Sequence, residues 1–143
     1  MSLAIEEARE AEREGEVPIG CVVVVESRVI AGAHNRPIAL KDPCAHAEIL
    51  ALRQAGRRLE NYRLTEAAVY VTIEPCVMCV GAMINARIKR LVYGAPDSKA
   101  GAIESLFRLG SDDRMNHQLE VTSCVLEEGC RALMKDFFAS RRA

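Results

Sequence analysis

The sequence predicts a three-layer α/β/α fold, in which a five-stranded mixed sheet lies between two layers of helices. Helical and strand-like hydrophobic patterns alternate along the whole chain, which favours α/β layers. The chain has 143 residues, of which 50% are hydrophobic and 27% charged, a composition typical of a globular protein with one core. No repeat, low-complexity tract or Pro/Gly-rich linker divides it. We therefore expect residues 1–143 to form a single domain.

The first half of the chain is predicted to form a helix, a β-hairpin, a loop and a second helix. Ser2 suits the N-cap of the first helix, and Gly15 suits its end. Two β-rich segments on either side of a tight polar turn are typical of a hairpin, and two prolines favour the loop. Apolar residues at helical spacing indicate the second helix. The predicted segments are 2–15, the hairpin strands 19–25 and 28–33, the loop 35–45, and a helix that begins near His46.

The second half is predicted to supply the other three strands and two more helices. The segment 77–86 forms a short helix, with Pro75 in its first turn, where the fixed φ of proline suits a helix. A loop from residue 94 and an irregular stretch through 117 separate the fourth strand from the fifth. The predicted strands are 68–73, 90–93 and 119–125, and the last helix covers 127–141.

Charge and hydropathy exclude several classes of protein. The net charge is −1, so no strong overall field favours nucleic acid, although basic residues gather at the end of the last helix. That patch either meets phosphate or complements the helix dipole. No apolar run reaches the roughly 20 residues of a membrane helix, and the acidic N-terminal segment is unlike a secretory signal. We expect a cytoplasmic protein without a membrane span.

The six cysteines are expected to be reduced, because a chain of this length has a core and lacks a signal. Cys21, Cys124 and Cys130 lie among apolar residues and are predicted to be core residues. Cys76 and Cys79 differ, because their spacing is that of metal ligands.

Two short clusters predict a catalytic zinc site. Cys76 and Cys79, at positions i and i+3, share one face of a helix N-terminus, where the helix dipole favours thiolates. His46, at the start of another helix, supplies a third ligand. Three protein ligands leave a tetrahedral Zn²⁺ one position for water, which is typical of catalytic sites. Glu48, two residues from His46, is then predicted to carry protons between that water and the substrate.

These residues resemble a known family. His-x-Glu followed by Pro-Cys-x-x-Cys is the signature of the zinc-dependent nucleoside and nucleobase deaminases, which have the cytidine-deaminase-like fold. Within that superfamily the chain is most similar to the bacterial tRNA-specific adenosine deaminases, and the similarity covers nearly its full length. The segments that carry it are EVPIG, HNRPI, DPCAHAEILALRQ, NYRL, YVTIEPCVMCVGAMINARI, YGAPDSKAGA, MNH and DFFASRR.

The resemblance implies hydrolytic deamination of the wobble adenosine of an arginine tRNA to inosine, with one Zn²⁺ per subunit of a homodimer. It implies that Asn35 hydrogen-bonds the flipped base, and that Ala47 also binds substrate. It further implies that Asp97 and Lys99 contact flanking nucleotides. The residues expected to meet the anticodon stem and loop are Phe138, Arg141 and Arg142.

Some alternatives remain open on the residues alone. Cys44 is a possible fourth ligand that would close the metal site, and Asn35 suits a turn as well as a base contact. Phe137 and Phe138 point in different directions on a helix, so that one packs and one is exposed. A deaminase of free guanine, cytosine or a nucleotide would use the same metal site. A structural zinc or RNA-binding module would not need Glu48.

Overall fold

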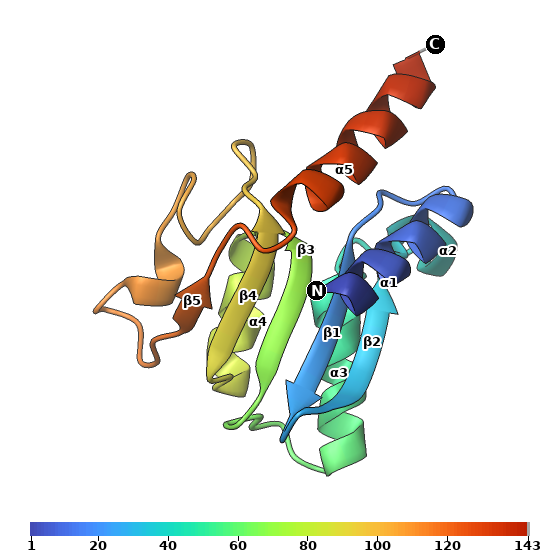
Figure 1. Cartoon of the computed structure of the whole chain (residues 1–143). Helices are drawn as coiled ribbons and strands as arrows, with labels where there is room; N and C mark the ends of the chain where they lie inside the picture. Colours follow the sequence, from blue (N-terminus) through green and yellow to red (C-terminus); the bar gives the residue numbers. More distant parts are fainter. Residues whose placement is uncertain (143) are drawn as a thin grey trace.

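The protein forms a five-stranded sheet with helices on both faces, as a computed structural model shows for residues 1–142 (Figure 1). The predicted order of strands and major helices is confirmed. The helices are α1 (Ser2–Arg13), α2 (Pro37–Leu40), α3 (Ala47–Leu59), α4 (Val77–Ala86), the 3₁₀ turn η1 (Leu109–Ser111) and α5 (Glu127–Arg142). The strands are β1 (Gly20–Val25), β2 (Arg28–His34), β3 (Ala68–Ile73), β4 (Arg90–Ala95) and β5 (Glu120–Thr122).

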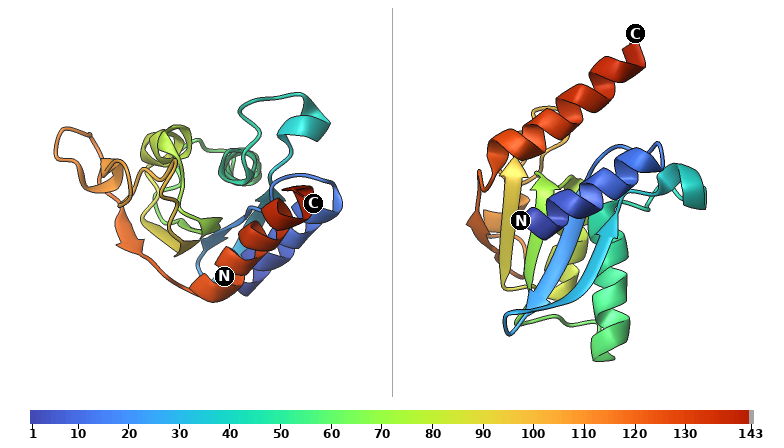
Figure 2. Two further views of the ribbon diagram at one scale, coloured as in Figure 1. Left: turned by 90° about the horizontal axis from the view of Figure 1, so that it is seen from above. Right: turned by 45° about the vertical axis from the view of Figure 1, so that its right-hand side comes forward.

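The helices form two separate layers. The view from above in Figure 2 shows α1 and α5 side by side on one face of the sheet, with α3 and α4 on the other. The contacts between elements agree with this view. Helix α1 packs on β1 and β2, α5 packs on β3 and β4, and α3 packs on β1, β2 and α4. The predicted α/β/α layers are therefore confirmed.

The sheet is mixed, with strand order β2-β1-β3-β4-β5. β1 runs antiparallel to both β2 and β3, whereas β3, β4 and β5 are parallel. Consequently β2, β3 and β4 all end at the same edge of the sheet. The residues that follow these three ends are Asn35, Glu74 and Pro96, so segments far apart in sequence meet at this edge.

The main core lies between the sheet and the α3–α4 layer. Strand side chains such as Val23, Val69 and Leu91 pack there against Met83 and Ile84 of α4, and all are at most 2% exposed. A smaller cluster of Ile73, Ala95 and Cys130 fills the space under α5. Burial of each large apolar side chain contributes about 1.5–3 kcal/mol to the free energy of folding, and this burial holds the layers together.

The close approach of α1 to the sheet depends on small residues. Ala4, Ala8 and Ala11 form the buried stripe of α1. Gly20, at the start of β1, has no side chain to separate the helix from the strand. A Cβ there would lie 2.0 Å from the carbonyl oxygen of Ala4, so α1 can pack at this distance only because residue 20 is glycine.

Three predicted helix features were wrong. Met1, not Ser2, is the N-cap of α1, and no side chain caps it. Pro75 lies before the N-cap residue Cys76 and is therefore outside the first turn of α4. Within the predicted loop the chain makes a short helix, α2, that begins at Pro37, because the Glu16 carboxylate accepts the N–H groups of Ile38 and Ala39.

Differences also occur in the strands. β4 continues to Ala95, and β5 covers only Glu120–Thr122 at the edge of the sheet, where one neighbour alone pairs with it. Cys124 is exposed with a φ of 61° in the turn before α5, so its predicted core position was wrong. Cys21 and Cys130 are buried, as predicted. Of the helices in residues 1–142, none is both long enough and apolar enough to cross a membrane.

Candidate metal centre and active site

Two helix N-termini bring the predicted zinc ligands together. His46 is the N-cap residue of α3 and Cys76 is the N-cap residue of α4, both with extended backbone, and Cys79 lies in the first turn of α4. The Nδ1 atom of His46 is 3.6 Å from Sγ of Cys76 and 3.5 Å from Sγ of Cys79. All three donor atoms lie within 4.8 Å of one another. In residues 1–142 this is the one His/Cys/Asp/Glu group with such spacing.

The donor set fits Zn²⁺. Bonds of about 2.0 Å to nitrogen and about 2.3 Å to sulfur at tetrahedral angles separate the N and S atoms by roughly 3.5 Å. The separations of 3.5 and 3.6 Å from His46 match this value. Three donors leave one tetrahedral position for a small molecule. His46, Cys76 and Cys79 can therefore hold a zinc ion in an open site.

The electrostatics of the cysteine pair also favour a metal. A hydrogen bond from Cys79 lowers the pKa of Cys76 to about 4, and the positive ring of His46 adds to this effect. The same hydrogen bond and burial raise the pKa of Cys79. Without metal the pair shares one thiolate, and a divalent cation would stabilise both sulfurs as thiolates.

Glu48 lies beside this cluster in the first turn of α3 and is 3% exposed. Burial raises the pKa of its carboxyl group to about 7, against hydrogen bonding that lowers it. Its Oε2 atom is buried and has no hydrogen-bond partner among residues 1–142. An unpaired buried carboxylate oxygen is costly, so this atom is available to a ligand or water at the metal centre.

Asn35 connects β2 to the active-site helix. Its side chain is buried, and its Oδ1 atom accepts the N–H of Ala47 at 2.8 Å. Asn35 is therefore more than an exposed turn residue. Because Oδ1 is already paired, the amide NH₂ group is the part of Asn35 that can bind a substrate. Ala47 is fully buried, and the structure pairs its N–H with Asn35. The substrate roles of both residues stay predictions.

The possible fourth ligand Cys44 and the two remaining histidines lie elsewhere. Cys44 is exposed and is not in the metal-binding cluster. His34 faces the carboxylates of Glu7 and Glu14, and His117 contacts the carbonyl oxygen of Ile88. The cluster therefore has three protein ligands and not four.

A cleft lies between the ends of β3 and β4 and the helix α5, and Ile73, three residues before Cys76, is part of its lining. Its volume is about 570 Å³. Apolar side chains form much of its lining, and four predicted RNA-binding residues line it as well, namely Asp97, Lys99, Phe138 and Arg142. Phe138 is 40% exposed, whereas Phe137 is buried, which decides which of the two rings is available. The cleft combines an aromatic ring with cations, as single-stranded RNA sites do.

Arg141 is not brought into this cleft. Its guanidinium group donates to the carbonyl oxygen of Gly15 and lies 4.2 Å from the centre of the Phe137 ring. These contacts tie α5 to the end of α1, so the structure gives Arg141 a different partner from Arg142. Its predicted role in RNA binding stays a prediction.

Sequence reasoning missed Glu74, which lies between β3 and the ligand Cys76. Glu74 is 3% exposed and accepts hydrogen bonds from the loop that follows β4. A charged residue directly after a buried apolar strand was the available signal, because such a residue must be paired.

Fold and site together define a deaminase with the cytidine-deaminase-like α/β fold. A family model described as MafB19-like deaminase matches residues 1–142. The tRNA-specific adenosine deaminase of Haemophilus influenzae is 51% identical over 143 residues, which cover 99% of this chain and 83% of that protein. The enzyme of the same name from Bacillus subtilis is 45% identical over 142 residues, covering 99% and 88%. This chain belongs to the family of tRNA-specific adenosine deaminases.

Solved structures agree with this assignment. A structure from a study of A-to-I editing by tRNA:A34 deaminases at the wobble position matches with a TM-score of 0.91 and 47% identity. The match covers 93% of this chain and 96% of that chain. A guanine deaminase from Nitrosomonas europaea matches with a TM-score of 0.79 and 27% identity, covering 96% and 82%.

Proposed function

We propose that the chain is a zinc-dependent tRNA adenosine deaminase, which converts the wobble adenosine of an arginine tRNA anticodon to inosine. The observation that carries the proposal is the open His46-Cys76-Cys79 cluster beside the buried Glu48, whose Oε2 atom has no hydrogen-bond partner among residues 1–142. The reaction consumes one water and releases one ammonia per adenosine.

His46, Cys76 and Cys79 would hold the zinc ion. When bound there, zinc would supply Lewis-acid activation of the water that attacks C6 of the purine. Glu48 accepts one proton of that water and delivers it to N1 of the base. It then takes the second proton from the attacking oxygen and passes it to the leaving amine, which departs as ammonia. The NH₂ group of Asn35 donates to an acceptor on the base, while its Oδ1 remains paired with Ala47. Asn35 thus orients the base against the helix that carries His46 and Glu48.

The RNA is proposed to enter through the cleft beside α5. The ring of Phe138 offers a stacking surface, and Lys99 and Arg142 offer charge for phosphate. Asp97 accepts the N–H groups of Lys99 and Ala100, so its carboxylate shapes the turn from which Lys99 projects. These contacts give the site a preference for a nucleotide within RNA over a free base.

The two terminal arginines are expected to respond differently to substitution. Arg142→Ala should weaken RNA binding and lower the slope of log K against log salt by about 1, because one phosphate contact is lost. Arg141→Ala should lower the melting temperature and leave the salt slope unchanged, because Arg141 contacts Gly15 and Phe137. Titrations of an anticodon stem-loop RNA at several salt concentrations measure the slope for each variant, and thermal melting measures the stability. A reduced slope for Arg141→Ala would place Arg141 in the RNA interface.

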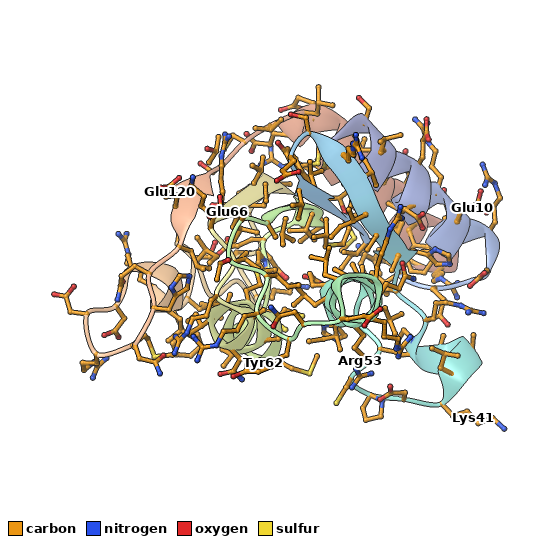
Figure 3. The ribbon with its side chains drawn as sticks, turned by 90° about the horizontal axis from the view of Figure 1, so that it is seen from below. Glu10, Lys41, Arg53, Tyr62, Glu66 and Glu120 are labelled. Carbon is orange, nitrogen blue, oxygen red and sulfur yellow. The ribbon has the colours of Figure 1, made fainter. Side chains whose placement is uncertain are left out.

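A homodimer is part of the proposal, and the outer face of α3 and α4 is the candidate contact. Figure 3 shows Arg53 and Tyr62 pointing away from the sheet on this side. A groove of about 370 Å³ lies here, lined by apolar residues that include Leu52, Tyr62 and Ala82. Tyr62 is 73% exposed, and the neighbouring Arg63 both donates to its hydroxyl and lies over its ring. Its ring adds exposed apolar surface beside this groove.

Tyr62→Glu is therefore expected to convert the dimer to a monomer, because it places a charge in an apolar contact. Light scattering during gel filtration measures the mass. Val29→Glu, at another exposed apolar position, is the control and should remain dimeric. An unchanged mass for Tyr62→Glu would exclude this surface as the dimer contact.

We further propose the cytoplasm as the location, where the proposed tRNA substrate is found.

The test of the proposed function is inosine formation on an anticodon stem-loop RNA with a wobble adenosine. Free adenosine, guanine and cytosine are assayed in parallel, with and without a chelator. Chelator-sensitive conversion of the RNA alone is the expected result. Turnover of a free base in place of RNA would instead place the chain with the small-molecule deaminases.

A further inference from the structure

The carboxylate of Glu74 is enclosed by donors from one loop. Its Oε1 atom accepts the N–H of Asp97 at 3.1 Å and the hydroxyl of Ser105. Its Oε2 atom accepts three consecutive backbone N–H groups, those of Ile103, Glu104 and Ser105, at 2.9 to 3.1 Å. Consecutive amides that converge on one oxygen form an anion-binding nest. Here the anion is a side chain of the protein itself.

These hydrogen bonds hold Glu74 as a carboxylate. Burial disfavours the charged form, but the donors from Glu104, Ser105 and Asp97 outweigh it, and the pKa of Glu74 is lowered. A buried charge with this many donors is not explained by packing alone, because an apolar side chain would need none of them. The proposed chemistry does not use Glu74 either.

Gly101 allows the loop to close on the carboxylate. A Cβ at residue 101 would lie 2.3 Å from Cδ of Glu74 and 2.6 Å from the carbonyl oxygen of Asp97. The N–H of Gly101 donates to that same carbonyl oxygen at 2.9 Å. The next N–H, of Ala102, donates to the carbonyl oxygen of Pro75 at 2.8 Å. The 97–105 loop is thus tied at both ends to the two residues before Cys76.

We propose that Glu74 is a positioning residue for RNA recognition, which fixes the 97–105 loop relative to the metal centre so that Asp97 and Lys99 line the cleft under α5. This inference rests on the proposed function. The loop connects two functional elements: Pro75, which it contacts, directly precedes the ligand Cys76, and Asp97 and Lys99 line the cleft. Glu74 is neither a member of the metal-binding cluster nor part of the cleft lining, and it therefore acts through the loop.

Glu74→Gln tests the proposal with little change in volume. One acceptor oxygen becomes an NH₂ group, which faces N–H donors and cannot pair with them. The loop is expected to shift, and Kd for the stem-loop RNA to rise roughly tenfold, because small displacements of positioning groups have effects of this order or larger. The single-turnover rate at saturating RNA and the zinc content should change less than twofold.

Gly101→Ala tests the same contact from the other side. It leaves the carboxylate intact but forces the loop away from it, so a similar rise in Kd is expected. The double variant should bind the RNA no more weakly than the weaker-binding single variant, because both substitutions break the same contact between Glu74 and the loop. Hydrogen exchange at the amides of residues 103–105 should accelerate in all three variants, with or without RNA.

Two controls separate positioning from general loss of stability. Glu66→Gln makes the same change at an exposed carboxylate and should match the wild type. Val23→Ala, in the core of β1, should lower the melting temperature without changing Kd for RNA. If Glu74→Gln lowers the melting temperature but leaves Kd and the exchange at 103–105 unchanged, Glu74 is only structural and the inference is overturned. If the wild type itself neither binds nor edits the RNA, the proposed function fails, and the inference fails with it.

Discussion

Glu48→Ala is expected to lower the rate of inosine formation at least about a thousandfold, within the range that general acid–base catalysis contributes. Glu48 is the one carboxylate beside the metal-binding cluster, and Oε2 has no other partner among the described residues. No neighbouring side chain can therefore take over its proton transfers. The measurement is single-turnover conversion of a stem-loop RNA at saturating enzyme.

The same variant should keep its zinc, because His46, Cys76 and Cys79 are unchanged. Metal analysis of the purified protein checks this. Glu48→Gln preserves the shape of the side chain and should be equally inactive, since an amide does not carry the proton. Neither variant should melt at a lower temperature than the wild type, because burial of the Glu48 carboxyl group, whose Oε2 atom has no partner among residues 1–142, is destabilising. Glu66→Ala, at an exposed carboxylate, is the matched control for loss of a charge.

Activity close to that of the wild type in Glu48→Ala would contradict the proposed mechanism. It would leave a structural zinc or RNA-binding module as the better description of the site. Loss of both zinc and activity would show instead that Glu48 supports the metal.

Cys79→Ala is expected to remove both the zinc and the activity. Cys79 is fully buried in the first turn of α4, and two remaining donors form a weak zinc site. The melting temperature should fall as well, because a metal that binds only the folded state stabilises it by mass action. A chelator should have the same effects on the wild type, and added Zn²⁺ should reverse them. Metal analysis, thermal melting and inosine formation measure the three consequences.

Cys44→Ser is the matched control, since Cys44 is an exposed cysteine two residues before His46. It should keep zinc content, stability and turnover. Loss of zinc in Cys44→Ser would indicate a fourth protein ligand and would contradict the open site.

The sequence predicted the reactive residues well because their signals are local. Cys76 and Cys79 share one turn of α4, and His46 and Glu48 share the start of α3. Spacing of this kind can be read without knowledge of the fold. Of the strands, β3 has its predicted bounds, whereas β5, which has one neighbour in the sheet, ends earlier than predicted.

Residues with long-range partners could not be assigned in this way. On the residues alone Asn35 suited a turn better than a base contact, and only the structure showed its bond to Ala47, twelve positions away in sequence. Arg141 and Arg142 are adjacent and chemically identical, yet only Arg142 lines the cleft. The charge of Glu74 after a buried strand indicated that it needs partners but not which ones, because its donors lie 23 to 31 residues away along the chain.

The sequence by itself therefore determined the α/β class, the order of the major elements, the candidate donors for zinc and the resemblance to a deaminase family. These follow from hydrophobic periodicity and from short motifs, which depend on neighbours within one or two turns. The tertiary structure decided which of these groups meet, because the mixed sheet ends β2, β3 and β4 at one edge. It also decided that Glu74 anchors the 97–105 loop. The hydrogen-bond donors of a buried charge can come from segments distant in sequence, and a local sequence pattern does not predict which segments those are.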